Sequence, residues 1–501
     1  MPFSDIILPL ALAVPLVASL LLFVSGRRIP GGVVNALAGI GFLFPAVAGI
    51  TAWATFSGGG GYDFLVTLPF GIKALGIALT LGLNGISLPL FVLAGLVGAA
   101  AGIQALESKV DDKPAYLALL LFMLGGMLGM FASVDVFFFY FFHEFALIPA
   151  FILILRWGGA GRRTAAIQMA VYLTLGAMVA LAGIILLYLK SGANTFDMIA
   201  LRHALAAAPI EGGEANTIFG LLLFGLGILV SLFPFHSWAP AAYTEAPTPV
   251  SMMHAGVLKK FGLYGLIQLG VLMVPAGLQY WAPVLFWLAL GNILIIGFVT
   301  MSQRHLKEMI SCSSVMHMGP CFMGIYAFAA GGGRDTAGLG AAVVLMFAHG
   351  LAVAAMFALS HGIYRRTKTL EFGESGGLAK RAPVFAAFFV AASMAGIGLP
   401  GFANFWGELG VFVSLGSVPA WRLALVASGI VISAIYALRA VAAVFFGAEP
   451  EALTKRRETV PVRDITWNER CIVCILLAAL VATGFYPRLF TDTLNLALNL
   501  N

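Results

Sequence analysis

The chain has 501 residues, of which 61% are hydrophobic and only 10% are charged, whereas soluble domains are about 25% charged. This composition excludes a soluble globular protein and predicts a chain that crosses a membrane many times. The formal net charge of +6 suggests anionic partners in a soluble protein, but here we attribute it to orientation in the membrane.

The apolar segments predict fourteen membrane-spanning helices, since a helix needs about 20 apolar residues to cross a bilayer. An even number of crossings places both termini on the same side. With the N-terminus outside, most Lys and Arg residues fall on inner loops, as the positive-inside rule requires. The expected helices are 6–24, 33–56, 83–106, 115–132, 134–155, 166–189, 216–239, 249–273, 281–301, 308–330, 337–363, 383–416, 421–446 and 467–487.

Two of these helices carry a proline-containing break, Pro234 in S-L-F-P-F-H-S-W and Pro400 in G-I-G-L-P-G-F-A-N-F-W-G-E. The breaks fall in the fourth member of two five-helix sets, and an odd number of helices inverts the second set. The sequence therefore predicts four units: 1–114 with three helices, repeats at 115–273 and 281–446, and 447–501 with an inner-side loop and the last helix. Inverted repeats with broken helices are typical of ion and solute transporters.

Three ionisable residues lie in the middle of predicted helices. Glu144, in F-F-F-Y-F-F-H-E-F, is a candidate proton carrier because a carboxylate in hydrocarbon is costly, although it could instead be the structural partner of a buried cation. Lys260 lies midway along the eighth helix beside Lys259. Adjacent helical residues point about 100° apart, so one lysine is expected to face a polar path while the other packs or extends toward the interface.

Further candidates lie in the second repeat. Glu408 follows the break at Pro400, where it is either a proton-carrying group or a cap for the restarted helix. His317 and His349 lie inside the tenth and eleventh helices and are either proton relays or hydrogen-bonded packing residues. No H-x-x-x-H or H-E-x-x-H pattern is present, so we expect no metal site. No glycine-rich phosphate-binding loop follows a strand, so we expect no bound nucleotide.

Several segments, in order, resemble the antiporter-like subunits of respiratory complex I, and most closely subunit M (chain M) of bacterial NADH:quinone oxidoreductase. They are H-E-F-A-L-I-P-A-F-I-L-I-L-R-W-G-G, P-F-H-S-W-A-P-A-A-Y-T-E-A-P-T-P-V-S, A-G-V-L-K-K-F-G-L-Y-G-L, S-S-V-M-H-M-G and L-P-G-F-A-N-F-W-G-E. The resemblance implies proton pumping, with Glu144, Lys260 and Glu408 at functional positions and His317 and His349 on a central polar axis.

The resemblance also implies where the chain works and with what. It implies a bacterial inner (cytoplasmic) membrane, and there the distribution of Lys and Arg places both termini on the periplasmic side. The expected partners are membrane lipid, two further antiporter-like subunits and the quinone-site subunits, and no nucleic acid. NADH, FMN, iron–sulfur clusters and quinone would be bound by partner subunits, and no cofactor or redox chemistry is expected in this chain.

The sequence departs from the family pattern at Leu229, where the resemblance implies a lysine, and at 239–243, where A-P-A-A-Y replaces L-P-D-A-H. Either Glu144 pairs with Lys259 or Lys260 instead, or proton transfer in this chain is altered. The alternatives are a subunit of a multi-subunit Na⁺/H⁺ antiporter or of an energy-converting hydrogenase, and a structural coupling subunit that does not pump. A self-contained solute carrier is the weakest alternative.

Overall fold

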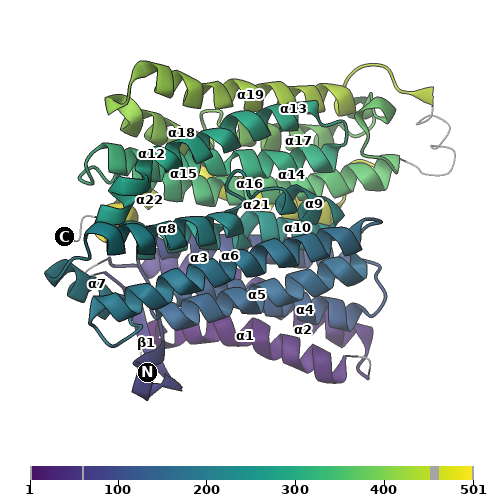
Figure 1. Ribbon diagram of the computed structural model, residues 1–501. Coiled ribbons are helices and arrows are strands. Elements are labelled where there is room, and N and C mark those ends of the chain that lie inside the picture. Colours follow the sequence, from purple (N-terminus) through teal and green to yellow (C-terminus); the bar gives the residue numbers. More distant parts are fainter. Residues whose placement is uncertain (1–2, 27, 59–60, 452–461, 499–501) are drawn as a thin grey trace.

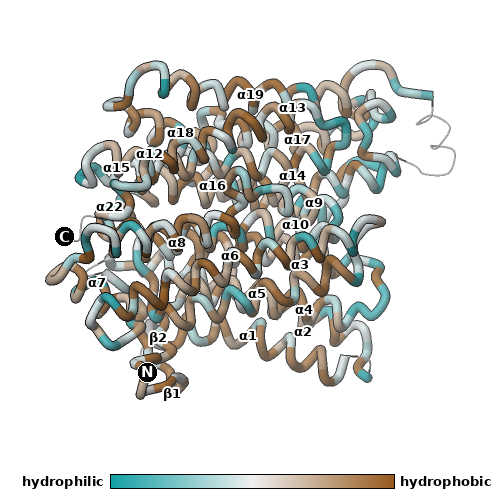
Figure 2. Tube along the Cα trace, viewed as in Figure 1, coloured by the Kyte–Doolittle hydropathy of each residue, from teal (hydrophilic) through white to brown (hydrophobic). Residues whose placement is uncertain are grey.

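The computed structural model describes residues 3–26, 28–58, 61–451 and 462–498. Its helices lie side by side and nearly parallel, and both ends of the chain lie at the same end of the bundle (Figure 1). Hydrophobic residues run along the helices and hydrophilic residues gather in the loops at the two ends (Figure 2). This is the distribution expected of a protein whose helices cross a bilayer.

The helices of the first half are α1 (Phe3–Ser25), α2 (Gly31–Thr55), α3 (Ser87–Glu107), α4 (Lys113–Ala132), α5 (Val136–Trp157), α6 (Arg162–Ser191), α7 (Met198–Ala207), α8 (Gly212–Val230), α9 (Trp238–Glu245), α10 (Thr248–Met253) and α11 (Lys260–Gly265). Those of the second half are α12 (Pro275–Gly291), α13 (Gly297–Ser302), α14 (Leu306–Met316), α15 (Met318–Ala330), α16 (Ala337–Thr367), α17 (Pro383–Ile397), α18 (Ala403–Ser414), α19 (Ala420–Phe445), α21 (Trp467–Phe485) and α22 (Arg488–Leu498). Wider π-helical turns occupy η2 (His254–Leu258), η3 (Leu266–Val271) and η4 (Asn292–Ile296).

Eleven helices of the described residues are long and apolar enough to cross a membrane. The expected crossings at 249–273, 308–330 and 383–416 are also helical, but each is built from shorter pieces. The polytopic helical fold is therefore confirmed, while the total of fourteen crossings stays a prediction.

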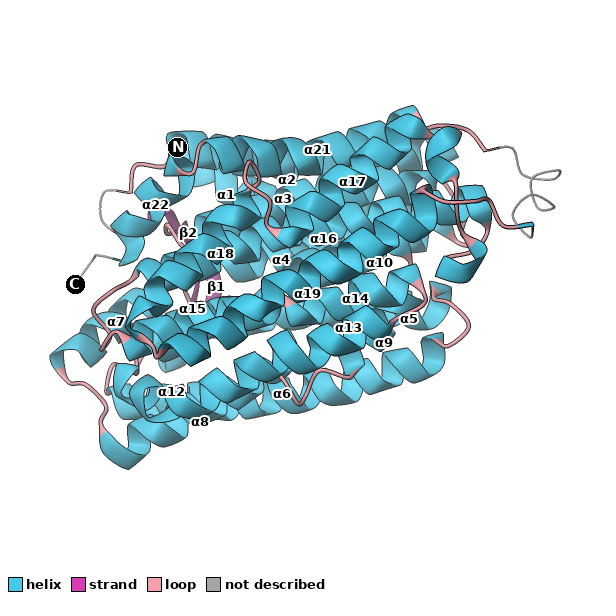
Figure 3. Cartoon of the chain, turned by 90° about the horizontal axis from the view of Figure 1, so that it is seen from above, coloured by secondary structure: helices cyan, strands magenta, loops and turns pink. Residues whose placement is uncertain are grey.

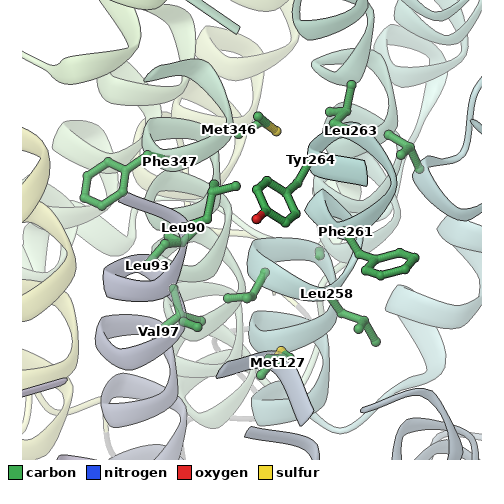
Figure 4. Packing of buried hydrophobic residues seen from close by; sticks show 14 of the residues in the cluster. Leu90, Leu93, Val97, Met127, Leu258, Phe261, Leu263, Tyr264, Met346 and Phe347 are labelled. Atoms are coloured by element: carbon green, nitrogen blue, oxygen red, sulfur yellow. The ribbon is translucent and has the colours of Figure 1, made fainter. Parts of the chain in front are cut away.

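The centre of the bundle is formed by α16, whose most apolar stretch is completely buried, and by α3, where 94% of that stretch is buried. Figure 3 shows α16 in the interior, with α6, α8 and α12 along one outer edge. Apolar side chains of α3, α11 and α16, among them Leu93, Leu263 and Phe347, fill the space between these helices (Figure 4). His349 and Ser360 on α16 are therefore shielded from lipid.

Both predicted breaks are confirmed. In the first repeat α8 ends at Val230 and α9 begins at Trp238, with Ser231 in the left-handed region at φ 68°. In the second repeat α17 ends at Ile397, and Gly398 has φ 84° before α18 begins. The division into units at 1–114, 115–273, 281–446 and 447–501 stays a prediction, and residues 452–461 of the last unit lie outside the described part.

An antiparallel hairpin of β1 (Asp63–Ile72) and β2 (Ile77–Leu83) was not expected from the sequence. The third crossing therefore begins later than the predicted residue 83, at Ser87. Asp135 joins the hairpin to α5, because its carboxylate accepts hydrogen bonds from the N–H groups of Phe137 at 2.8 Å and of Ala78 at 3.0 Å. The hairpin lies at the end of the bundle that also holds the termini (Figure 1).

Candidate functional site

A buried hydrogen bond joins the two halves of the chain at Lys259. Its Nζ donates to the carbonyl oxygen of Ser314 at 2.7 Å and to the Ser314 hydroxyl at 3.0 Å. The π-helical turn η2 directly precedes Lys259, and the ammonium also lies 5.4 Å from the centre of the Tyr243 ring. Lys259 is only 2% exposed, so its charge is compensated by these groups rather than by solvent.

The polar chain continues from Ser314 into the second half. The Ser314 hydroxyl and His349 Nε2 lie 3.2 Å apart, and the rings of His349 and His317 are 5.3 Å apart between centroids. His317, at the junction of α14 and α15, shares a hydrogen bond of 2.8 Å between its Nε2 and the Tyr436 hydroxyl. Tyr436 donates in turn to Ser313. The structure thus brings the two predicted histidines together.

Glu408 lies at the far end of this line and is 7% exposed. It is the sixth residue of α18, which has no acidic residue in its first turn and no side-chain cap, so the capping interpretation is wrong. Its carboxylate lies against Gly398 in the break, where an added Cβ would be 2.3 Å from Oε2. Glu408, His317 and Ser433 line one small cavity with room for about one water molecule.

The two adjacent lysines have different surroundings. Lys260 is completely buried, and its Nζ donates to the carbonyl oxygen of Ala255, in the π-helical turn of its own helix, at 2.6 Å. Lys259 points to the second half instead. The polar chain of hydrogen bonds therefore begins at Lys259, although the resemblance singled out Lys260.

Glu144 does not belong to this line of buried polar side chains. Its side chain is 32% exposed, and along α5 it shares one outward stripe with the exposed residues Phe137, Phe141 and Ile148. The nearest titratable side chain is that of His143, with Nδ1 3.5 Å from Oε1. Among the described residues no ion pair joins Glu144 to either lysine, so the structure does not support the first of the two alternatives, in which Glu144 pairs with Lys259 or Lys260.

Sequence reasoning missed the residue that holds the first break in place. Asn292 Oδ1 accepts a hydrogen bond from the Phe233 N–H at 2.8 Å, and its Nδ2 donates to the carbonyl oxygens of Ser231 at 3.1 Å and Val315 at 3.0 Å. One amide thus satisfies backbone groups of both the broken segment and α14. The only signal in the sequence was an amide within the apolar run G-N-I-L-I-I-G.

Within the described residues no group of three or more His, Cys, Asp or Glu side chains is placed to hold a metal ion. The functional groups are therefore two amines, two imidazoles, a carboxyl and several hydroxyls in a helical core. Together the fold and this site define a multi-pass membrane protein with a line of buried titratable residues that crosses the boundary between its two halves.

Residues 133–433 match the family described as NADH:quinone oxidoreductase/Mrp antiporter, transmembrane. NAD(P)H-quinone oxidoreductase chain 4 of a Synechococcus species is 33% identical over 428 residues, covering 84% of this chain and 78% of the relative. The corresponding chain 4 of a Picosynechococcus species is 36% identical over 446 residues, covering 87% and 80%. The chain therefore belongs to the NADH:quinone oxidoreductase/Mrp antiporter transmembrane family.

Solved structures agree with this assignment. A chain of respiratory complex I from Thermus thermophilus with bound NADH superposes with a TM-score of 0.86 and 26% identity, covering 98% of both chains. A chain of the Mrp complex from a Dietzia species has the same fold, with a TM-score of 0.83 at 20% identity and coverage of 99% and 98%.

Proposed function

We propose that the chain is a proton-translocating membrane subunit of NADH:quinone oxidoreductase, complex I, and couples quinone reduction to proton transport. The observation that carries this proposal is the buried line from Lys259 through Ser314, His349 and His317 toward Glu408. Isolated charges in hydrocarbon cost several kcal/mol, so a row of ionisable groups across a lipid-shielded core is unfavourable unless it has a function.

Each group on the line has a role that its chemistry allows. Lys259 and Lys260 alternate between charged and neutral forms as they accept and release a proton. A neutral imidazole accepts a proton at one nitrogen and releases another from the second, so His349 and His317 serve as relays. Glu408 is the terminal acceptor. The proton moves along this line of side chains, and none of them is bonded to a redox centre.

The remaining chemistry belongs to partner subunits. NADH, FMN, iron–sulfur clusters and quinone are bound there, and the partners include two further antiporter-like subunits and the quinone-site subunits. The membrane is the bacterial inner membrane, with both termini on the periplasmic side. The positive-inside distribution of Lys and Arg supports this orientation.

Glu144 is assigned a place at the surface of the chain that faces a neighbouring membrane subunit. A partly exposed carboxylate between apolar neighbours such as Phe141 and Ile148 is unfavourable against lipid tails. A packed protein neighbour supplies polar partners at that depth. Glu144 then senses the charge of the adjacent subunit and influences the line through His143, which stacks on Phe261 next to Lys260.

The test replaces Lys260 or Glu408 by alanine in the intact complex. We expect fewer protons pumped per NADH oxidised while the assembled complex persists, measured in inverted membrane vesicles and by native gel electrophoresis. Lys380→Ala is the control, because this lysine is exposed. An unchanged proton-to-electron ratio in both variants would contradict the proposal.

Leu229 favours a second candidate, a structural coupling subunit that transmits motion without pumping. The position is buried at 3% exposure and provides no cation beside the first break. This alternative predicts that substitutions of Lys260 and Glu408 impair assembly or quinone reduction but leave the pumping ratio intact. The same vesicle experiment therefore separates the two candidates.

A further inference from the structure

A wide polar groove opens at one end of the bundle, and its walls come from five separate segments. It is lined by residues within 104–116, 157–160, 244–249, 305–308 and 360–370. All five fall at loops that the charge distribution predicts on the inner side of the membrane. The groove contains ionisable side chains, among them Glu107, Glu245 and His361, and is large enough to hold many water molecules.

One face of α14 leads from this groove to the buried line. Lys307, Ser311 and Ser314 follow each other at intervals of four and three residues, which places them on a single face of the helix. Lys307 borders the groove, and its Nζ donates to the Ala246 carbonyl oxygen at 2.6 Å. Ser311 and Ser314 are completely buried, and Ser314 receives Lys259. Polar residues thus continue without interruption from the groove to Lys259.

The hydroxyls of Thr244 and Ser311 lie where the groove meets this face of α14. Thr244 lines the groove, and its Oγ1 donates to Ser311 Oγ at 3.1 Å. The Ser311 hydroxyl donates in turn to the Lys307 carbonyl oxygen at 2.8 Å. In this arrangement the Ser311 proton points toward the groove and away from Ser314. Side chains three residues apart on a helix have Cβ atoms about 5–6 Å apart, a distance that one water molecule or a rotated hydroxyl can bridge.

We propose that Thr244 and Ser311 form a hydroxyl gate through which protons pass between the groove and Lys259. This inference rests on the proposed function and names the access route to its line of residues. In the closed arrangement the hydrogen of Ser311 is held by the Lys307 carbonyl. Rotation of the Ser311 side chain about χ1 redirects it to Ser314 and opens the route. Each hydroxyl accepts an incoming proton and passes on its own, so no net charge remains on the gate.

The gate accounts for the departure at Leu229. A route through Thr244 and Ser311 reaches Lys259 without using Glu144 or a lysine at position 229. It also gives Lys307 a positioning role, because its bond to Ala246 ties the segment between α9 and α10 to α14. The distance between the two gate hydroxyls depends on that tie.

The experiment removes the gate hydroxyls while keeping side-chain volume, with Thr244→Val and Ser311→Ala in the intact complex. We expect proton pumping per NADH to fall toward the level of Lys259→Met, with normal assembly, and Thr244→Ser to retain pumping. The matched control is Thr300→Val, because Thr300, like Ser311, is completely buried, and its hydroxyl donates to the carbonyl oxygen of Ile296, four residues before it, rather than to the groove.

The outcomes are distinguishable. If Lys259→Met abolishes pumping and both gate variants pump normally, the gate is refuted and the proposed function stands. If Lys259→Met also pumps normally, the proposed function itself fails. If Thr300→Val loses as much pumping as Ser311→Ala, the loss reflects a general sensitivity of buried hydroxyls, and the gate is likewise refuted.

Discussion

Replacing Lys259 by arginine or methionine tests the junction between the two halves of the chain. Methionine keeps much of the length of the side chain but removes the donor that bonds the Ser314 carbonyl and hydroxyl at 2.7 and 3.0 Å. Arginine keeps a charged donor, yet it does not give up its proton in a protein. A structural role is therefore preserved by arginine and lost with methionine, whereas a proton-carrying role is lost with both.

The size of the effect follows from the bonds that Lys259 makes. A hydrogen bond to a charged group contributes about 1.5–3 kcal/mol. If the methionine variant loses one such contribution when the proton passes Ser314, transfer slows by about 10- to 150-fold, because about 1.4 kcal/mol corresponds to a factor of ten in rate. Arginine should slow transfer at least as much, while the thermal stability of the complex stays near that of the parent.

The assay follows proton uptake by inverted membrane vesicles during NADH oxidation, with the oxidation rate measured in the same sample. Lys380→Met, at an exposed position, controls for loss of a positive charge. Pumping by Lys259→Arg at the parental ratio would refute the reasoning, since it would show that the amine holds Ser314 in place without passing on a proton.

The remaining predictions concern the groups further along the line. Glu408→Gln keeps the shape of the side chain and removes the titrating group, so the pumping ratio should fall with normal assembly. Gly398→Ala should produce the same loss, because its φ of 84° and a Cβ 2.3 Å from the Glu408 carboxylate force that side chain to move. Gly396→Ala, where an added Cβ meets nothing within 4 Å, should pump normally. Tyr436→Phe removes the hydroxyl between His317 and Ser313 and should lower the ratio, and a parental ratio would exclude that hydroxyl from the path. Asn292→Leu removes three hydrogen bonds to backbone groups and should destabilise the chain by about 1.5–4.5 kcal/mol, detected as a lower unfolding temperature of the complex.

The positions of the helices could be predicted because a long apolar run between polar loops is a strong sign of a membrane-spanning helix in the sequence alone. The breaks at Pro234 and Pro400 could also be predicted, since proline lacks the backbone N–H that a continuous helix needs. The hairpin at 63–83 was not predicted although V-T-L and A-L-T-L alternate, because such short alternating segments are weak signals beside the long apolar runs that flank them. The crossings at 249–273 and 308–330 were also predicted as continuous helices, since nothing in A-G-V-L-K-K-F-G distinguishes a π-helical turn from an α-helical one.

The direction of Glu144 could not be predicted for a physical reason. In a soluble protein an apolar stripe marks the buried face of a helix, but α5 is apolar all round because both lipid and protein accept apolar side chains. The periodicity of apolar residues therefore cannot distinguish the face of α5 that points into the protein from the face that points outward. Ser314 could not be predicted as the partner of Lys259 for another reason. It lies 55 residues away in the sequence, and nothing in S-C-S-S-V-M-H indicates which serine contacts a lysine.

The charged groups and the irregular backbone belong to one arrangement. Lys260 bonds a carbonyl of the π-helical turn before it, Lys259 bonds a carbonyl in the last turn of α14, and Glu408 lies against the break at Gly398. The last four carbonyls of a helix lack partners within it, and a π-helical turn likewise rearranges the hydrogen-bonding ladder. In hydrocarbon these groups are the available substitutes for water around a charge. A regular helix at either lysine site would engage these carbonyl oxygens in its own hydrogen bonds, so the interruptions in the backbone leave them available to the lysines.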